Sequence, residues 1–191
     1  MLSESTRIAH SFYSETENRQ RQDMPSMDTQ KILFVCLGNI CRSPAAEGIM
    51  NALVQQRASS GDKILCDSAG IGDWNITGDP PDPRMTRHAR QRGYPLSGRA
   101  RQFDPTGDFH EFDYIVTMDA KIDAHVRTLA PDAEQASKIH PMADFCRKIA
   151  VKEVPDPYYG GADGFEEVLN ILEDACSGLL AHLAGSKKRV R

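Results

Sequence analysis

The sequence predicts an α/β fold in which helices cover both faces of a parallel sheet. Short apolar runs, typical of buried strands, alternate along the chain with longer segments of helical periodicity. A strand that is followed by a helix and then by another strand forms a crossover unit, which makes the two strands parallel. The 191 residues suffice for one domain, because domains commonly contain about 100–200 residues.

The first strand is expected at Ile32–Val35, a continuous apolar run that suits a strand buried on both faces. Ser43 offers an N-cap oxygen and Pro44 suits the first position of a helix. We therefore expect a helix over residues 45–57, whose apolar side chains form one stripe.

The alternation then continues to the end of the chain. The next expected elements are a strand at Lys63–Ser68, a helix at Pro83–Arg92, a strand at Tyr114–Met118, a helix over residues 120–129 and a short strand near Ile139. The last helix has the clearest pattern, because apolar residues repeat at helical spacing from Phe165 to Leu183. Asp163 and Glu166 resemble its capping box.

Both ends of the chain differ from this pattern. Residues 1–30 are polar and of mixed charge, without apolar periodicity, which is typical of a disordered extension. They also lack the apolar stretch of a signal peptide. We therefore expect one domain over residues 31–185 and a basic tail at residues 186–191.

Charge and cysteine content narrow the class of protein. The chain has 23 Lys and Arg against 27 Asp and Glu, and its net charge of −4 argues against nucleic acid or an anionic membrane as a partner. It has no apolar run of about 18 residues, which a membrane span needs. Its five cysteines, an odd number, favour a reducing compartment over a disulfide framework. We expect a cytoplasmic protein; nothing in the sequence indicates an oligomeric state.

The turn after the first strand carries the chemistry, because ligands of such folds bind outside the carboxyl ends of the strands. Gly38 and Asn39 tolerate left-handed backbone, so successive N–H groups can form an anion nest beside the positive end of a helix. Arg42 offers a fork of donors that matches phosphate oxygens. Cys36 faces this positive field, which favours its thiolate. A cysteine six positions before an arginine therefore predicts nucleophilic attack on a phosphoryl group.

These residues stand in the segment VCLGNICRSPAAE, which resembles the phosphate-binding loop of the low-molecular-weight protein tyrosine phosphatases. The resemblance covers roughly residues 31–183 and continues in the same order through DSAG at Asp67–Gly70, GDPPDPR at Gly78–Arg84, RARQF at Arg99–Phe103, FDYIVTMD at Phe112–Asp119 and VPDPYYGG at Val154–Gly161. It implies the family's fold, a four-stranded parallel sheet flanked by helices. It also implies hydrolysis of phosphotyrosine in protein substrates, with release of inorganic phosphate and without a metal or other cofactor.

The resemblance implies a role for each matching residue. Cys36 would attack phosphorus and form a cysteinyl-phosphate, Arg42 would stabilise the developing charge, and Asp156 would protonate the phenol that leaves. Substrate-binding positions would be Leu37, Gly38, Asn39, Ile40, Cys41, Ser43, Trp74, Tyr158 and Tyr159, and supporting positions would be Ser68 and Asp119.

Several of these residues also fit a purely structural role. Ser43 suits a helix cap, Ser68 a strand-end hydroxyl, and Asp119 the N-cap of the following helix. Trp74 equally fits an ordinary, partly buried tryptophan, and Asp156 between two prolines is also typical of a turn.

Two other activities occur on similar chains. Relatives that hydrolyse phosphoarginine have a threonine where Ile40 stands, so Ile40 favours phosphotyrosine. A thiol-dependent arsenate reductase would need two further cysteines close together downstream, whereas Cys66, Cys146 and Cys176 are far apart in sequence. A phosphate-binding module without activity is disfavoured because all three catalytic groups are present.

Cys41 has a separate expected role. The resemblance implies that Cys36, once oxidised by peroxide, forms a reversible disulfide with Cys41. A metal site at the two cysteines is disfavoured, because no pair of His or Cys stands nearby at ligand spacing.

Overall fold

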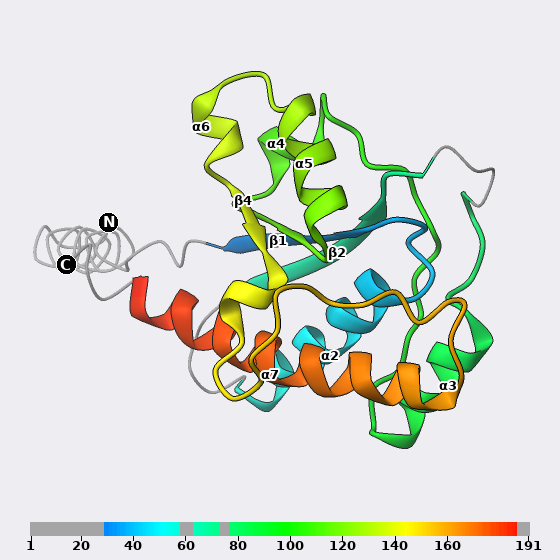
Figure 1. The fold of residues 1–191 in the computed structure, drawn as a ribbon. Helices are drawn as coiled ribbons and strands as arrows, with labels where there is room; N and C mark the ends of the chain where they lie inside the picture. The colour runs from blue at the N-terminus through cyan, green and yellow to red at the C-terminus, as the bar shows by residue number, and fades with distance from the viewer. Residues whose placement is uncertain (1–28, 58–62, 73–76, 187–191) are drawn as a thin grey trace, which may run out of the picture.

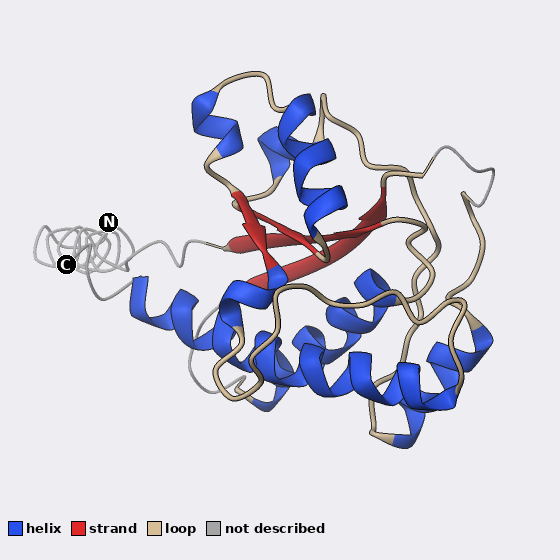
Figure 2. Cartoon of the chain, viewed as in Figure 1, coloured by secondary structure: helices blue, strands red, loops and turns tan. Residues whose placement is uncertain are grey.

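The computed structural model describes residues 29–57, 63–72 and 77–186. In this part of the chain a four-stranded sheet lies between two layers of helices (Figure 1), with strands and helices alternating along the chain (Figure 2). The predicted α/β fold is confirmed. Residues 1–28 and 187–191 lie outside the described ranges, so the expected extension and tail stay predictions, but their expected inner bounds are corrected, because Gln30 lies in the first strand and Ser186 in the last helix.

The sheet is parallel throughout, in the order β2 (Ile64–Gly70), β1 (Gln30–Cys36), β3 (Tyr114–Thr117) and β4 (Ile139–Pro141). β1 is central: it pairs with β2 along its whole length, and its residues from Ile32 to Val35 pair with β3. All four expected strands are therefore present, and β1 and β2 extend beyond the predicted apolar runs.

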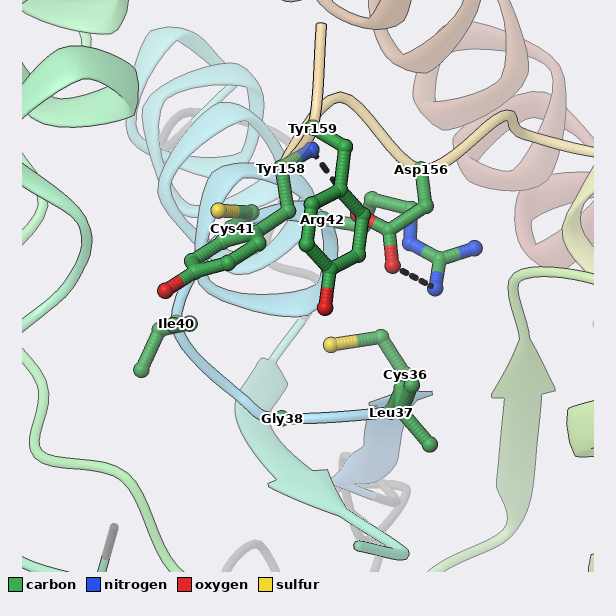
Figure 3. Close-up of a pocket in the computed structure, with 9 residues that line it drawn as sticks. All are labelled: Cys36, Leu37, Gly38, Ile40, Cys41, Arg42, Asp156, Tyr158 and Tyr159. Carbon is green, nitrogen blue, oxygen red and sulfur yellow. Dashed lines mark hydrogen bonds and ion pairs between the residues drawn. The ribbon is translucent and has the colours of Figure 1, made fainter.

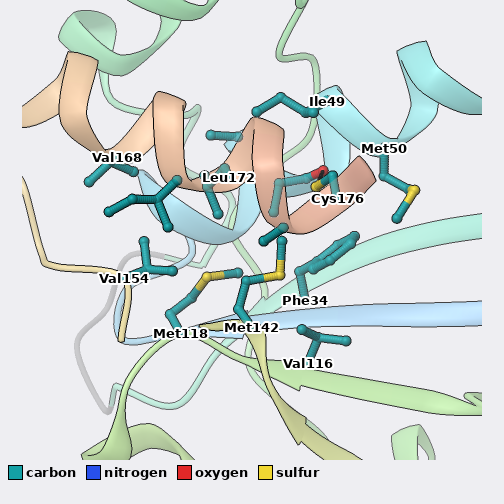
Figure 4. Close-up of a cluster of buried hydrophobic side chains, with 14 of the residues drawn as sticks. Phe34, Ile49, Met50, Val116, Met118, Met142, Val154, Val168, Leu172 and Cys176 are labelled. Carbon is teal, nitrogen blue, oxygen red and sulfur yellow. Dashed lines mark hydrogen bonds between the residues drawn. The ribbon is translucent and has the colours of Figure 1, made fainter. Parts of the chain in front are cut away.

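Both faces of β1 are buried, as its continuous apolar run predicts. Ile32 and Phe34 pack beneath α2 (Arg42–Gln56) and α7 (Ala162–Ser186), in the larger of two apolar clusters (Figure 4). Leu33 and Val35 point to the opposite face, where the smaller cluster lies. That face is covered by α4 (Asp108–Glu111), α5 (Ala120–Leu129) and α6 (Ala133–Ala136), as Figure 1 shows.

Helix α3 (Pro83–Gln91) begins after Asp82, whose carboxylate accepts the backbone N–H groups of Arg84 and Met85. At its other end α3 is joined to α7, because the carboxylate of Glu166 contacts His88 and Arg92. The capping box expected at the start of the last helix is therefore wrong. α7 begins at Ala162, so Asp163 already lies inside its first turn, and Glu166 binds to α3 instead.

Three short elements were not expected from the sequence: α4, α6 and the 3-10 helix η2 (Met142–Phe145). Each has four residues, which is about one helical turn and too short to produce a periodic pattern. Among the described helices, none has the length and apolar character needed to cross a lipid bilayer.

The strand order determines where a ligand can bind. From β1 the chain crosses by way of α2 to β2 on one side, and later returns to β3 on the other side. The carboxyl end of β1 is thus a topological switch point, where open α/β sheets form a crevice. Cys36 is the last residue of β1 and stands at this point.

Candidate active site

A pocket of about 330 Å³ opens at the carboxyl end of β1 (Figure 3). One side is the loop after β1, and the other is the segment that precedes α7. The lining residues are Cys36, Leu37, Gly38, Ile40, Cys41, Arg42, Asp156, Tyr158 and Tyr159. Four of the expected site residues that the structure describes are not in the lining: Asn39 and Ser43 bind Cys36, Asp119 binds Arg42, and Ser68 binds Asn39 behind the loop.

The Cys36 side chain points into the pocket (Figure 3), yet the residue is only 3% exposed. Its sulfur accepts a hydrogen bond from the backbone N–H of Asn39 at 3.2 Å and another from the hydroxyl of Ser43 at 3.0 Å. Asn39 has a φ of 53°, in the left-handed region, and this turns its N–H back toward the sulfur. Gly38 does not have a positive φ, so only one of the two residues expected in this conformation adopts it.

The expectation that Ser43 caps the helix is wrong. α2 begins at Arg42, so Ser43 lies inside the helix, and no side chain caps the helix N-terminus. The Ser43 hydroxyl is fully buried and binds the Cys36 sulfur instead. The helix start at Arg42 also places the first N–H groups of α2, and the positive end of its dipole, at the pocket.

A buried network behind the loop fixes Asn39. Its side-chain amide donates to Ser43 at 3.0 Å and to Ser68 at 2.9 Å, while its carbonyl oxygen accepts the backbone N–H of Arg101 at 2.8 Å. Ser68 in turn donates to the carboxylate of Glu47 at 2.7 Å. The amide of Asn39 thus has a partner for each of its polar groups, which holds the left-handed turn in place.

Glu47 is a residue of this network that sequence reasoning missed. It stands four positions after Ser43, so both lie on the same side of α2. The residues around it in the first two turns of α2 are Pro44, Ala45, Ala46, Gly48 and Ile49, so a carboxylate interrupts an apolar segment. This isolated charge in an apolar segment was the one sequence feature that could have indicated a role for Glu47.

Gly70, the last residue of β2, lets the sheet approach the loop closely. A Cβ at this position would lie 2.9 Å from the carbonyl oxygen of Leu37 and 3.0 Å from the backbone nitrogen of Asn39. The first contact is shorter than Cβ atoms normally make, the second is tighter than most of them make, and both are to backbone rather than to a flexible side chain. Glycine at position 70 is therefore required for the observed loop.

Arg42 connects three segments of the chain. Its guanidinium donates to Asp119 at 2.7 Å, to the carbonyl oxygen of Val154 at 3.1 Å and to Asp156 at 3.0 Å. The residue is 2% exposed, so these bonds hold a buried charge in a fixed orientation. Asp119 also accepts the N–H of Ile122 at 2.9 Å and so caps α5. The two roles considered for Asp119 are both present.

Asp156 lies across the pocket from the loop, between Pro155 and Pro157. One carboxylate oxygen accepts from Arg42 and the other from the backbone N–H of Tyr158, at 3.2 Å. Its side chain is 37% exposed, so the carboxyl group can exchange protons with water. This position suits a group that delivers a proton to a leaving group in the pocket.

Tyr158 and Tyr159 form an aromatic wall at the mouth of the pocket. Their rings meet edge to face, with centroids 5.0 Å apart, and Tyr159 is 93% exposed. The guanidinium of Arg84 lies over the Tyr158 ring, 5.3 Å from its centroid, and is held there by Asp82. Trp74, expected on the opposite wall, lies outside the described residues.

All five cysteines are free thiols, and only Cys36 and Cys41 line the pocket. Burial, reinforced by the carboxylate of Asp82, raises the pKa of the Cys41 thiol. Burial likewise raises the pKa of Cys66 to about 12 and also raises the pKa of Cys146 and Cys176. The last three thiols therefore stay protonated near neutral pH and are not placed to relay electrons from Cys36.

Within the ranges that the structure describes, no cluster of three or more His, Cys, Asp or Glu side chains could hold a metal ion. The polar side chains in the lining are those of Cys36, Cys41, Arg42, Asp156, Tyr158 and Tyr159. The backbone N–H of Asn39 donates to the Cys36 sulfur, and α2 begins at Arg42, at the end of the same loop. This combination suits an enzyme that acts on phosphate esters.

Comparison with known proteins agrees with this class. The family model for low molecular weight phosphotyrosine protein phosphatase matches residues 31–189. The chain belongs to this family, and it is a protein-tyrosine phosphatase.

The relatives share nearly their whole length with this chain. The protein slr0328 of Synechocystis sp. is 52% identical over 80% of this chain and 96% of its own length. The low molecular weight protein-tyrosine-phosphatase of Streptomyces coelicolor is 43% identical over 80% of this chain and 93% of its own. A crystal structure of a protein tyrosine phosphatase from Entamoeba histolytica, with Hepes in its active site, has a TM-score of 0.77 and 42% identity, covering 83% of this chain and 99% of that one.

Proposed function

We propose that the protein hydrolyses phosphotyrosine in protein substrates through a cysteinyl-phosphate intermediate, with Cys36 as nucleophile and Asp156 as general acid. The observation that carries this proposal is the arrangement around one pocket, where Cys36 and Arg42 of the loop after β1 meet Asp156, which lies 114 residues after Arg42 in the chain. Phosphotyrosine protein substrates agree with the family to which the chain belongs.

In the first step the Cys36 thiolate attacks phosphorus, and the bond between phosphorus and the phenolic oxygen breaks. The electron pair of that bond stays on the phenolic oxygen, which takes the proton of Asp156 and leaves as neutral tyrosine. The loop N–H groups and Arg42 stabilise the negative charge on the transferring phosphoryl oxygens. The hydrogen bonds from Asn39 and Ser43 to the Cys36 sulfur support its thiolate form.

In the second step water attacks the cysteinyl-phosphate. Asp156, ionised by the first step, takes a proton from this water while the bond between phosphorus and sulfur breaks. Inorganic phosphate forms, the thiolate of Cys36 returns and Asp156 is again protonated. The cycle is closed by these groups, and no electron transfer is needed.

We propose phosphotyrosine rather than phosphoarginine as the substrate. Ile40 and the ring of Tyr158 both line the pocket and offer apolar surface to a phenyl ring. A guanidinium group carries a charge and several N–H donors, for which the aliphatic side chain of Ile40 supplies no acceptor.

The test is hydrolysis of phosphotyrosine and phosphoarginine side by side, with EDTA and a reductant, by the wild type and by Cys36→Ser. We expect release of phosphate from phosphotyrosine by the wild type only, while Cys36→Ser still binds inorganic phosphate. A preference for phosphoarginine would keep the nucleophile and change the substrate class. Equal activity of Cys36→Ser would contradict the mechanism.

We further propose that residues 30–186 form the catalytic domain, which agrees with the family match over residues 31–189. The five free thiols agree with a reducing compartment, and we propose the cytoplasm.

A further inference from the structure

A chain of hydrogen bonds leads from the nucleophile to a carboxyl group outside the pocket. Ser43 donates to the Cys36 sulfur at 3.0 Å, Asn39 donates to Ser43 at 3.0 Å and to Ser68 at 2.9 Å, and Ser68 donates to Glu47 at 2.7 Å. Cys36, Asn39, Ser43 and Ser68 are all buried. A change at Glu47 therefore reaches Cys36 through atoms that water does not easily replace.

The direction of each bond follows from its end at Glu47. An ionised carboxylate can only accept, so the single proton of the Ser68 hydroxyl points to Glu47. The atom of Asn39 that faces Ser68 must then be a donor, which is the amide nitrogen. On its other side Asn39 faces the N–H of Arg101, which requires the carbonyl oxygen there. The orientation of the Asn39 amide is thus fixed from both ends.

This orientation decides what the Ser43 hydroxyl does. Ser43 has one proton and two possible acceptors, the Cys36 sulfur at 3.0 Å and the carbonyl oxygen of Ala69 at 3.3 Å. Asn39 delivers an N–H to the Ser43 oxygen and occupies one of its lone pairs. With the amide held in place, the hydroxyl proton remains directed at the sulfur.

We propose that Glu47 is a positioning residue, which acts through Ser68 and Asn39 to keep the Ser43 proton on the Cys36 sulfur. The inference rests on the proposed role of Cys36 as nucleophile. It assigns to α2 a function beyond its N-terminal dipole, because Glu47 stands in the second turn of that helix.

The surroundings of Glu47 suit this role. A second pocket, of about 380 Å³, opens between α2 and the segment from Gly93 to Gly98, and Glu47 is the one charged residue in its lining. Through this pocket its carboxyl group can exchange a proton with solvent. Two charged side chains act on the carboxyl group of Glu47: Asp67 on β2 and Arg101 in the segment between α3 and α4.

Burial is the largest effect on this carboxyl group and raises its pKa, Asp67 raises it further, and the Ser68 hydrogen bond and Arg101 lower it. The acceptor-only form is therefore lost as the pH falls through this raised pKa. Arg101 does not neutralise Glu47 directly, because its guanidinium binds Asp67 and Asp108.

The test compares Glu47→Leu with Glu47→Gln, because glutamine keeps an oxygen that can accept from Ser68. Two quantities are measured against pH: kcat/KM for phosphotyrosine, and the rate at which iodoacetate alkylates Cys36. For Glu47→Leu we expect kcat/KM to fall about 10-fold, the usual effect of leaving buried partners unsatisfied. We expect the pH at which alkylation of Cys36 reaches half of its maximal rate to rise by about 0.5–1 unit, because the thiolate loses a hydrogen bond. Glu47→Gln should stay within about 3-fold of wild type at neutral pH.

Asn51→Leu is the matched control, because Asn51 lies one turn further along α2 and lines the same pocket. It should leave both pH profiles unchanged. Equal losses in Glu47→Leu and Asn51→Leu would overturn the proposal, because they would reflect the helix face rather than the carboxylate.

A second comparison tests the path through Ser68. In a Ser68→Ala background, Glu47→Leu should lower kcat/KM by less than about 2-fold, because residues of one network are not additive. If Glu47→Leu has its full effect in that background, Glu47 does not act through Ser68 and the proposal is wrong. Cys36→Ser tests the nucleophile separately: an inactive Cys36→Ser together with an unaffected Glu47→Leu would overturn only this inference.

Discussion

Asp119 binds Arg42 with one carboxylate oxygen and caps helix α5 with the other. Oδ2 accepts from the guanidinium at 2.7 Å, and Oδ1 accepts the backbone N–H of Ile122 at 2.9 Å. The same side chain therefore orients a buried cation of the active site and starts the helix that covers the opposite face of the sheet.

The two roles of Asp119 can be separated by Asp119→Ser and Asp119→Ala. Neither side chain reaches Arg42, so we expect both variants to lower kcat/KM about 10- to 100-fold, as for loss of a hydrogen bond to a charged group. Serine still caps a helix and alanine does not, so Asp119→Ala should be less stable than Asp119→Ser by about 1 kcal/mol. Urea unfolding measures this difference, and equal stabilities would exclude the cap as a contribution.

Asp156→Ala should lower kcat/KM for phosphotyrosine by about 10²–10⁴, because the phenol then leaves without a proton. The loss should be smaller for p-nitrophenyl phosphate, since nitrophenolate is a stable anion and needs protonation less. Measurement of kcat/KM across a series of aryl phosphates checks this, with a steeper dependence on leaving-group basicity expected in the variant. An unchanged dependence would remove Asp156 from the first step.

Gly70→Ala should disturb the phosphate-binding loop from behind. The added Cβ would lie 2.9 Å from the Leu37 carbonyl oxygen, so we expect a loss of about 1–3 kcal/mol in stability and a lower kcat/KM. Gly185→Ala is the control, because a Cβ there meets nothing within 4 Å, and helical alanine should keep or slightly increase stability. If both variants have the same free energy of unfolding as the wild type, the close approach of β2 to the loop does not require glycine at position 70.

Oxidation of Cys36 by peroxide gives a sulfenic acid with release of water, and Cys41 closes the disulfide as its thiolate displaces hydroxide. Because burial and Asp82 raise the pKa of the Cys41 thiol, its thiolate is scarce at neutral pH. At pH values below that pKa, we expect closure to accelerate about tenfold for each unit by which the pH is raised, following the thiolate fraction. Mass spectrometry after timed quenching follows the link, and Cys146→Ser should behave as the wild type. Irreversible sulfonic acid at Cys36 without a link would contradict the pairing.

The main chain of this fold could be predicted from the sequence because each element of normal length has its own periodic pattern. β1 was found from the apolar run at Ile32–Val35, and α5 was found with its observed bounds. Elements of one turn, such as α4 and α6, have no period, and they form because the surrounding chain positions them. Cys36, Gly38 and Arg42 were found because spacing in sequence fixes spacing within one short turn, whereas the other pocket residues were implied by the resemblance to the family.

Side-chain hydrogen bonds could be predicted less well. Ser43 stands where a cap is normal, but α2 begins at Arg42, so Ser43 lies inside the helix and its buried hydroxyl donates to the Cys36 sulfur. The spacing of Glu166 from Asp163 fits a capping box. In the fold, however, Glu166 binds Arg92, which precedes it by 74 residues and lies at the end of α3. Glu47 meets Ser68 from 21 residues away, a contact that depends on how α2 lies on β2.

The bonds of Arg42 also determine when the enzyme becomes able to act. Its partners Asp119, Val154 and Asp156 lie 77, 112 and 114 residues later in the chain. A growing polypeptide on the ribosome contains Cys36, the proposed nucleophile, early, but it lacks Val154 and Asp156, the proposed proton donor, until most of the chain has been made. We therefore expect a nascent chain to remain without activity until the segment that contains Val154 and Asp156 has been made and has folded against Arg42.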